Sequence, residues 1–197
     1  MTNTLESALL RISRFLEAQA TPYMVIGGFA NLQWGEPRLT RDLDLTVQVA
    51  EEGWPDFIAA VGAEFELLSD DPLTFVRANG ALPIAMHGGI RIDLIFESHP
   101  MVARAIARAK HINVAGRLVR FCTPEDLILH KLVAGRPRDQ ADVEGVIVRQ
   151  AENLDRSYLD PLVSEISTDL DRPDISQWYD ACLKKARLSQ SRHRLSE

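Results

Sequence analysis

The sequence has few cysteines and no long apolar run. Cys122 and Cys182 are its only cysteines, and it contains no Cys-x-x-Cys pair or Cys/His cluster. A disulfide framework or a structural zinc site is therefore excluded as the basis of the fold, and both thiols are interpreted as reduced, packed side chains. No stretch approaches the roughly 18 apolar residues of a membrane span. The N-terminus also lacks the basic region and apolar run of a signal peptide. The sequence therefore predicts a cytoplasmic protein with no membrane partner.

The bulk composition is that of a folded globular protein. Of 197 residues, 46% are hydrophobic and 25% charged, which is enough apolar material for a core without covalent or metal support. The length allows one compact domain or a small domain with a helical appendage. A net charge of −6 argues against a surface that grips nucleic acid indiscriminately, although a local basic patch remains compatible with it.

The pattern of apolar residues changes near residue 122. Before that point it predicts helices over 4–19, 29–34, 55–63 and 99–109, and strands over 23–26 and 42–49. It also predicts hairpins over 82–96, turning at His87-Gly88-Gly89, and over 111–121, turning at Ala115-Gly116. Thr123-Pro124-Glu125-Asp126 is typical of a helix start, and helices are predicted over 124–134, 138–150, 156–167 and 175–188. We therefore expect an α/β region over 1–122 and a helical region over 123–197.

Acidic residues on the predicted strands indicate where chemistry could occur. Asp42 and Asp44 alternate with Leu43 and Leu45, so both carboxylates project from one strand face, about 6–7 Å apart at the Cα atoms. Asp93 lies on the polar face of another predicted strand. Three converging carboxylates would repel one another unless cations lay between them. They are the oxygen ligands that Mg²⁺ prefers, and a pair of Mg²⁺ ions could hold a nucleoside triphosphate. That Asp93 meets the other two is a hypothesis from the pattern.

Gly27-Gly28 lies between a predicted strand and a predicted helix. Such a turn exposes backbone N–H groups at a helix N-terminus, where phosphate can bind. Glycine is also common there for backbone reasons alone.

Two longer motifs resemble a known superfamily. In the first, Gly27-Gly28 precedes Asp42-x-Asp44 by 13 residues, with the ending Arg38-x-Thr40-x-Asp42-x-Asp44. The second is Thr123-Pro124-Glu125-Asp126-Leu-Ile-Leu-His-Lys131, followed by Arg138-Asp139-x-x-Asp142. Together with Asp93 they resemble the DNA polymerase beta-like nucleotidyltransferases, and within them the AbiEii-type toxin branch or a close uncharacterised bacterial relative. The resemblance covers about residues 23–145. It departs from AbiEii toxins at Phe29, where a hydroxyl residue is common.

This resemblance implies a fold and an activity. The fold would be a small mixed β-sheet nucleotidyltransferase core with flanking helices, followed by a C-terminal helical region. The activity would be Mg²⁺-dependent transfer of a nucleoside monophosphate from an NTP to an acceptor hydroxyl, on RNA such as tRNA or on a protein. A toxin role with a cognate antitoxin partner is also implied.

The resemblance also implies residue roles. Asp42 and Asp44 would ligate two Mg²⁺ ions, and Asp93 would ligate the catalytic ion and help deprotonate the acceptor. The residues expected to bind the nucleotide are Gly27, Gly28, Arg38, Thr40 and Lys131.

Several alternatives stay open. Lys131 lies on a partly apolar helix face, where an ammonium needs an anionic partner, either Asp142 or the triphosphate. Arg38 either steadies a phosphate or the aspartate pair, or is an exposed loop residue. The basic C-terminal residues form a solvated helix end or contact RNA; they are Lys184, Lys185, Arg187, Arg192 and Arg194. A catalytically inactive nucleotidyltransferase fold, acting as a binding or antitoxin module, is the alternative function.

One further motif is disfavoured. Asp42-Leu-Asp44-Leu-Thr46 also matches the Asp-x-Asp-x-Thr of haloacid dehalogenase-type phosphatases. Those acids end a buried strand, whereas here the preceding residues are polar and the acids begin the strand.

Overall fold

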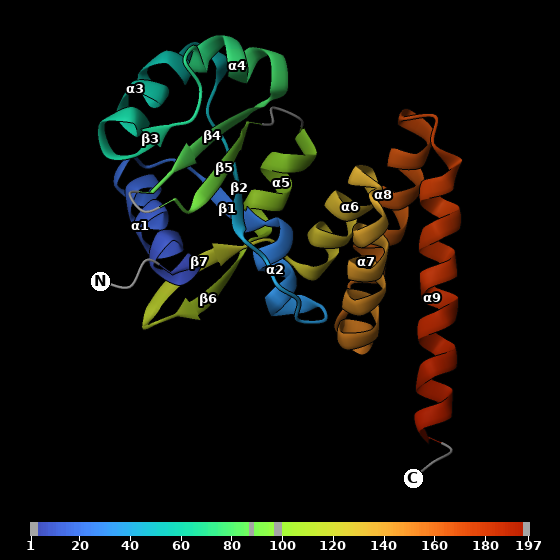
Figure 1. Ribbon diagram of the computed structural model, residues 1–197. Helices are drawn as coiled ribbons and strands as arrows, with labels where there is room; N and C mark the ends of the chain where they lie inside the picture. The colour runs from blue at the N-terminus through green and yellow to red at the C-terminus, as the bar shows by residue number, and fades with distance from the viewer. Residues whose placement is uncertain (1–3, 87–88, 97–99, 195–197) are drawn as a thin grey trace. The chain divides into compact units, whose positions relative to one another are not determined.

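The chain consists of two compact units that interleave along the sequence. The computed structural model describes residues 4–86, 89–96 and 100–194 (Figure 1). Residues 1–29 and 39–123 form the first unit, and residues 30–38 and 124–197 form the second. The helical unit therefore includes a segment, 30–38, that the sequence analysis assigned to the α/β region.

A mixed β-sheet forms the centre of the first unit. Within the described residues its strand order is β3-β4-β5-β2-β1-β7-β6. β2 with β5 and β1 with β7 are parallel, and the other neighbours are antiparallel. The strands are β1 Tyr23–Ile26, β2 Asp42–Val47, β3 Glu66–Leu67, β4 Ala81–Ala85, β5 Arg91–Phe96, β6 Lys110–Val114 and β7 Arg117–Phe121. The expected α/β fold with a mixed sheet is confirmed.

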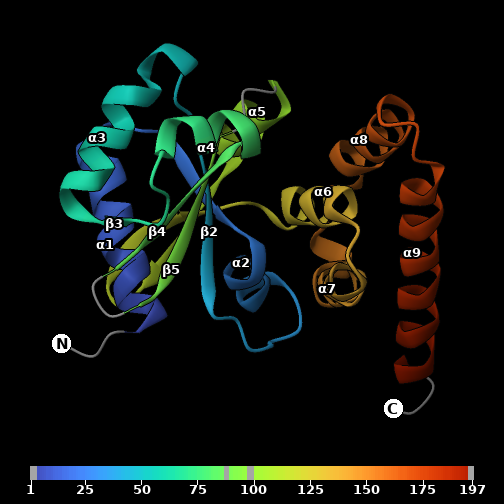
Figure 2. The same ribbon diagram turned by 45° about the horizontal axis from the view of Figure 1, so that its top comes forward.

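Helices flank this sheet. They are α1 Leu5–Ala18, the first turn of α2 Gly27–Trp34, α3 Trp54–Glu64, α4 Pro72–Asn79 and α5 Pro100–Arg108, with a short 3₁₀ turn η1 at Glu51–Gly53. α1 and α3 lie on one face of the sheet, as Figures 1 and 2 show. The ring of Phe57 on α3 packs edge-on against Phe96 of β5, with centroids 5.7 Å apart. α5 lies on the opposite face, where Arg120 of β7 donates from Nη2 to the carbonyl oxygen of Ile106.

Burial fixes which way β2 and β5 face. Their alternate side chains, Leu43, Leu45, Val47, Ile92, Leu94 and Phe96, are between 0 and 6% exposed. Full burial of each such side chain stabilises the fold by about 1.5–3 kcal/mol. A one-residue slip of either strand would turn these side chains out and its acidic residues in, so the register is strongly specified.

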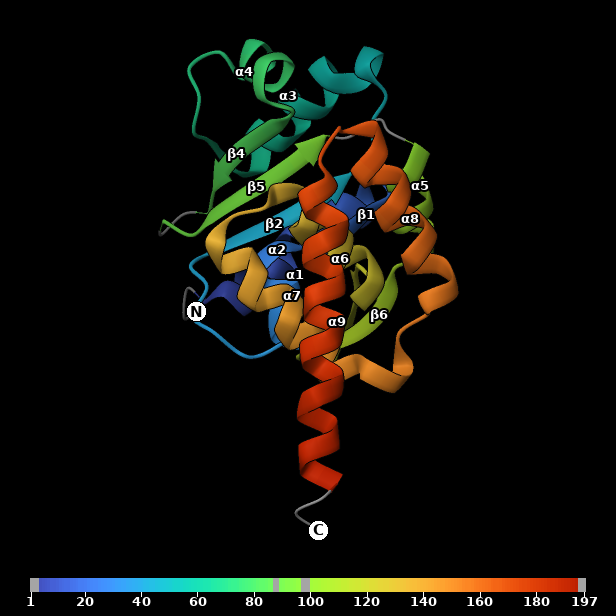
Figure 3. The ribbon, with the colours of Figure 1, turned by 90° about the vertical axis from the view of Figure 1, so that its right-hand side faces the viewer.

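The second unit is helical. Its helices are α6 Pro124–Ala134, α7 Pro137–Gln150, α8 Arg156–Asp169 and α9 Pro173–Arg194, with a 3₁₀ turn η2 at Ala151–Asn153. α6 packs on α7 and α8, and α9 runs beside α7 and α8 (Figure 3). Segment 30–38 is fastened to α7, because Arg149 donates to the carbonyl of Gly35 and Gln150 to that of Trp34.

The elements otherwise follow the sequence pattern, with two omissions. β3 has only two residues, and α4 buries only Val76, so neither leaves a clear apolar period. The strand expected over 42–49 ends at Val47, and the Val49 carbonyl accepts a hydrogen bond from Trp54 Nε1. Of the expected turn at 87–89, residues 87–88 lie outside the described residues. No helix in the described part of the chain has the length and apolar character needed to cross a bilayer.

Candidate active site

The three predicted acids lie on one face of the central strands. β2 and β5 pair in parallel with Asp44 directly beside Asp93 and Asp42 beside Arg91. Neighbouring strands are about 4.8 Å apart, and in-register neighbours project to the same face. The structure therefore brings Asp93 to the Asp42/Asp44 pair, on the face opposite the buried leucines.

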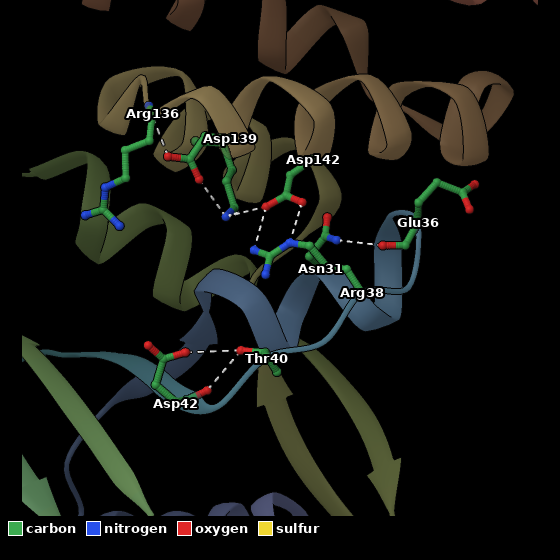
Figure 4. Close-up of polar contacts among 9 residues, drawn as sticks. Asn31, Glu36, Arg38, Thr40, Asp42, Arg136, Asp139 and Asp142 are labelled. Atoms are coloured by element: carbon green, nitrogen blue, oxygen red, sulfur yellow. Dashed lines mark hydrogen bonds and ion pairs between the residues drawn. The ribbon is translucent and has the colours of Figure 1, made fainter.

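Two local contacts hold the β2 carboxylates. Thr40 donates from Oγ1 to Oδ1 of Asp42 at 3.1 Å (Figure 4). Asp44 lies against Gly27: a Cβ added at Gly27 would stand 1.9 Å from Asp44 Oδ2. Gly27 also has a φ of +66°, which favours glycine. The first glycine of the motif is thus needed both for its backbone conformation and for the close approach of the Asp44 carboxylate. Gly28 follows it, buried, at the start of α2.

Arg91 is a cation among these carboxylates to which the sequence analysis gave no role. Its Nε lies 3.1 and 3.0 Å from the two Asp93 oxygens, and its Nη2 lies 2.9 Å from Oδ1. The hydrogen bonds to Asp93 outweigh burial and raise the pKa of Arg91, and the fields of Asp93, Asp42 and Asp44 add to this. The signal for Arg91 was its place two residues before Asp93, on the same strand face.

The donor set suits a divalent cation. On the polar face of β2 and β5 there are three carboxylates and one guanidinium, so these two strands carry an excess of negative charge there. Carboxylate oxygens are the ligands of hard cations such as Mg²⁺. Among the residues that the structure describes, no three His, Cys, Asp or Glu side chains are grouped so as to hold a metal ion. Asp93 accepts hydrogen bonds from Arg91 at both of its oxygens.

Lys131 and Arg38 lie in a buried ionic cluster of the second unit. Arg38 donates from Nε and Nη2 to the two oxygens of Asp142, each at 2.8 Å (Figure 4). Lys131 Nζ lies 2.7 Å from Asp142 Oδ2 and 2.8 Å from Asp139 Oδ1. Asp139 also accepts from the backbone N–H of Arg136 at the start of α7. Two buried carboxylates are thus matched by two cations.

This cluster bears on the alternatives for both basic residues. The ion pair between Lys131 and Asp142, one of the two partners considered for Lys131, is present. Arg38 is not an unattached loop residue, because its ion pair with Asp142 fixes segment 30–38 to α7. Burial alone would raise the pKa of Asp142, but hydrogen bonds from Arg38 and Lys131 outweigh it and hold that pKa below its usual value.

Comparison with known proteins identifies the fold. No protein-family model matches the sequence, and no curated protein matches it. An antigenic nucleotidyltransferase-like protein from Paracoccidioides brasiliensis has a similar structure, with a TM-score of 0.53 at 18% identity, covering 91% of this chain and 94% of that one. The antibiotic-resistance factor ANT(2'')-Ia gives 0.54 at 15% identity over the whole of both chains. The lincosamide antibiotic adenylyltransferase LnuA, in its lincomycin-bound structure, gives 0.52 at 14% identity, covering 74% of this chain and 98% of that one. The chain has a nucleotidyltransferase fold.

The likeness shows the fold alone, because each of these solved structures is less than 20% identical to this chain. A nucleotidyltransferase fold was expected from the Gly-Gly and Asp-x-Asp motifs, and the solved structures support it. The resemblance to the AbiEii branch stays a prediction.

We expect Gly27→Ala to displace the Asp44 carboxylate. Gly116→Ala is the matched control, because Gly116 also has a positive φ, +84°, but no described atom lies within 4 Å of the added Cβ. The control should lower the free energy of unfolding only by the cost of an alanine in the left-handed conformation, about 1–2 kcal/mol. In urea denaturation, Gly27→Ala should lower the free energy of unfolding by more than the control does. Adding Asp44→Ala to Gly27→Ala should bring the loss back to that of the control. Equal losses in the two single variants would contradict the close approach.

Lys131→Met should destabilise the second unit. It leaves two buried carboxylates with one cation, which costs about 3–5 kcal/mol when a buried pair is broken. The control is Lys185→Met, which removes an exposed pair with Glu144 worth at most about 1 kcal/mol. Because the pKa of Asp142 is depressed, the cluster's contribution is present above the unfolded pKa and lost as pH falls below about 4. A stable Lys131→Met protein that no longer binds NTP would instead support the triphosphate role.

Proposed function

We propose that this chain is a nucleotidyltransferase that moves a nucleoside monophosphate from an NTP to an acceptor hydroxyl. The observation that carries the proposal is the in-register pairing of Asp44 with Asp93, beside Asp42, on a sheet of nucleotidyltransferase fold. One structural neighbour is named an adenylyltransferase and another an antibiotic-resistance factor. This chain shares less than a fifth of its residues with each, so the activity is argued from its own site.

In the proposed reaction, each predicted residue of the first unit has a separate role. Asp42, Asp44 and Asp93 would hold two Mg²⁺ ions, which when bound neutralise phosphate charge and favour in-line displacement. The N–H groups at the start of α2, after Gly27-Gly28, provide a phosphate site at a helix N-terminus. Thr40 orients Asp42. Asp93 is suited to accept the proton of the acceptor hydroxyl. Lys131 and Arg38 belong to this proposal only as predicted nucleotide ligands, beside their ion pairs with the α7 carboxylates.

We infer that the acceptor is an RNA, such as tRNA, and its support is an acid-free stretch of the chain. Residues 98–124 contain five Arg and Lys and no Asp or Glu, in a protein whose net charge is −6. Its described part contains α5, β6 and β7, in the same unit as the aspartates. Arg104, Lys110 and His111 are exposed, whereas Arg117 is paired with Glu17.

The basic C-terminal residues give weaker support for RNA binding, because Lys185 is paired with Glu144. A toxin role with a cognate antitoxin rests on the motif resemblance to AbiEii-type enzymes. A protein hydroxyl is the other acceptor class that the resemblance implies.

Asp44→Asn should abolish nucleotide transfer and leave the fold intact. Its stability should be unchanged or slightly higher, since one of three clustered negative charges is removed. Asp93→Ala should weaken Mg²⁺-dependent NTP binding, and Asp56→Asn, an exposed acid on α3, is the control that should change neither. Labelled NTPs incubated with total RNA and with lysate provide the assay. If Asp44→Asn transfers nucleotide at the wild-type rate, or if the wild type transfers none, the proposed nucleotidyltransferase activity is wrong.

Arg104→Gln with Lys110→Gln should weaken tRNA binding and lower its salt dependence. For each phosphate that is no longer neutralised, the slope of log K against log salt should become shallower by about 0.7–0.9. Binding of NTP at the aspartates should hold. Lys184→Gln with Arg187→Gln is the equal-charge comparison on α9. A larger effect of the α9 variant would show that the RNA-binding surface lies on α9 instead. Label on a single protein band would show that the acceptor is a protein.

A further inference from the structure

Arg91 is a cation next to the three aspartates, and it binds Asp93, the one aspartate of the three that lies on β5. Its register partner on β2 is Asp42, and two residues along β5 its guanidinium spans both oxygens of Asp93. The pair is fork-like, with contacts of 2.9–3.1 Å. A bidentate guanidinium–carboxylate pair is directional and fixes the carboxylate it holds.

The two partners differ in how firmly their surroundings hold them. The Arg91 side chain is 55% exposed, whereas that of Asp93 is 19% exposed. An exposed ion pair of this kind contributes little net free energy, since water competes for both groups. Both residues belong to β5, whose register is fixed by burial, but the Arg91 side chain is the longer and more exposed of the two. Its guanidinium can therefore move into solvent without disturbing the sheet.

We infer that Arg91 is a built-in counter-ion of the carboxylate cluster, which occupies Asp93 until a divalent cation displaces it. Without metal, the guanidinium offsets one of three neighbouring negative charges and occupies both oxygens of Asp93. When the cation enters, Asp93 must exchange Arg91 for it, so Arg91 competes directly with metal. This inference rests on the proposed function, because it assumes that the three acids bind a divalent cation. It makes Arg91 a positioning residue that acts through Asp93.

The test measures metal binding by the full chain, using Mn²⁺ as the probe in calorimetry and in thermal denaturation. Arg91→Gln should bind Mn²⁺ about threefold to tenfold more tightly than the wild type, the change expected when a weak competing pair is removed. Its metal-free form should melt lower, and added Mn²⁺ should stabilise it more than it stabilises the wild type. Arg41→Gln removes an exposed charge next to Asp42 but has no place on the polar face, so it controls for net charge.

A double-mutant cycle separates competition through Asp93 from a general field effect. In an Asp93→Asn background, Arg91→Gln should no longer change Mn²⁺ affinity. Arg91→Lys, which keeps the charge but cannot span both oxygens, should fall between the wild type and Arg91→Gln.

The outcomes distinguish the two proposals. If the wild type and Arg91→Gln bind Mn²⁺ equally tightly, the role of Arg91 is overturned and the proposed enzyme activity is unaffected. An equal gain in Arg41→Gln, or a gain that persists with Asp93→Asn, also overturns it. Absence of Mn²⁺ binding in every variant overturns both, whereas binding by Arg91→Gln alone supports the inference in its strongest form.

Discussion

The in-register parallel pairing of β2 with β5 is the constraint on which the site depends. It places Asp44 beside Asp93, and nothing about the acids themselves favours that arrangement, since like charges repel. What holds them together is the other face of the same strands, where Leu43, Leu45, Ile92 and Leu94 are fully buried. The site is therefore maintained by apolar burial on the reverse side of the sheet, which offsets the repulsion between its carboxylates.

The two units differ in how the negative charge of neighbouring carboxylates is compensated. In the second unit Asp139 and Asp142 are only 3% exposed and are matched by Lys131 and Arg38, so the charges balance inside the protein. In the first unit three aspartates remain partly exposed, and β2 and β5 set one guanidinium, that of Arg91, against them. A balanced, buried cluster fixes backbone segments to one another. An unbalanced one at a surface attracts further cations, and for this reason the two clusters are assigned different roles despite their similar residue types.

The sequence predicted the local features well because these depend on neighbours along the chain. Alternation of apolar and acidic residues predicted the faces of β2 and β5, and Thr123-Pro124 predicted the start of the helical region. The need of Lys131 for an anionic partner was also predictable from its apolar helix face. Asp142 was one of the two partners expected for Lys131, and that ion pair is present. The role of Arg38 was not predictable, because its partner Asp142 is 104 residues away. The neighbour relation between Asp44 and Asp93 and the engagement of Asp93 by Arg91 depend on strand register. Register is a tertiary property that no single segment encodes.

Segment 30–38 makes the two units discontinuous along the chain. The polypeptide leaves the first unit after Phe29, returns at Leu39, and leaves again after Thr123, so three peptide connections join the two units. No single cut separates them. A fragment that begins at Pro124 would keep Lys131, Asp139 and Asp142 but lack Arg38, and its buried cluster would carry an excess negative charge. It would also lack the carbonyls of Trp34 and Gly35 that accept from α7. The helical half is thus completed by nine residues from a distant part of the chain, immediately before the strand that bears the aspartates. Insertions between Gly28 and Asp42 are accordingly constrained, because residues 30–38 of this short stretch belong to the second unit and the residues at its two ends belong to the first.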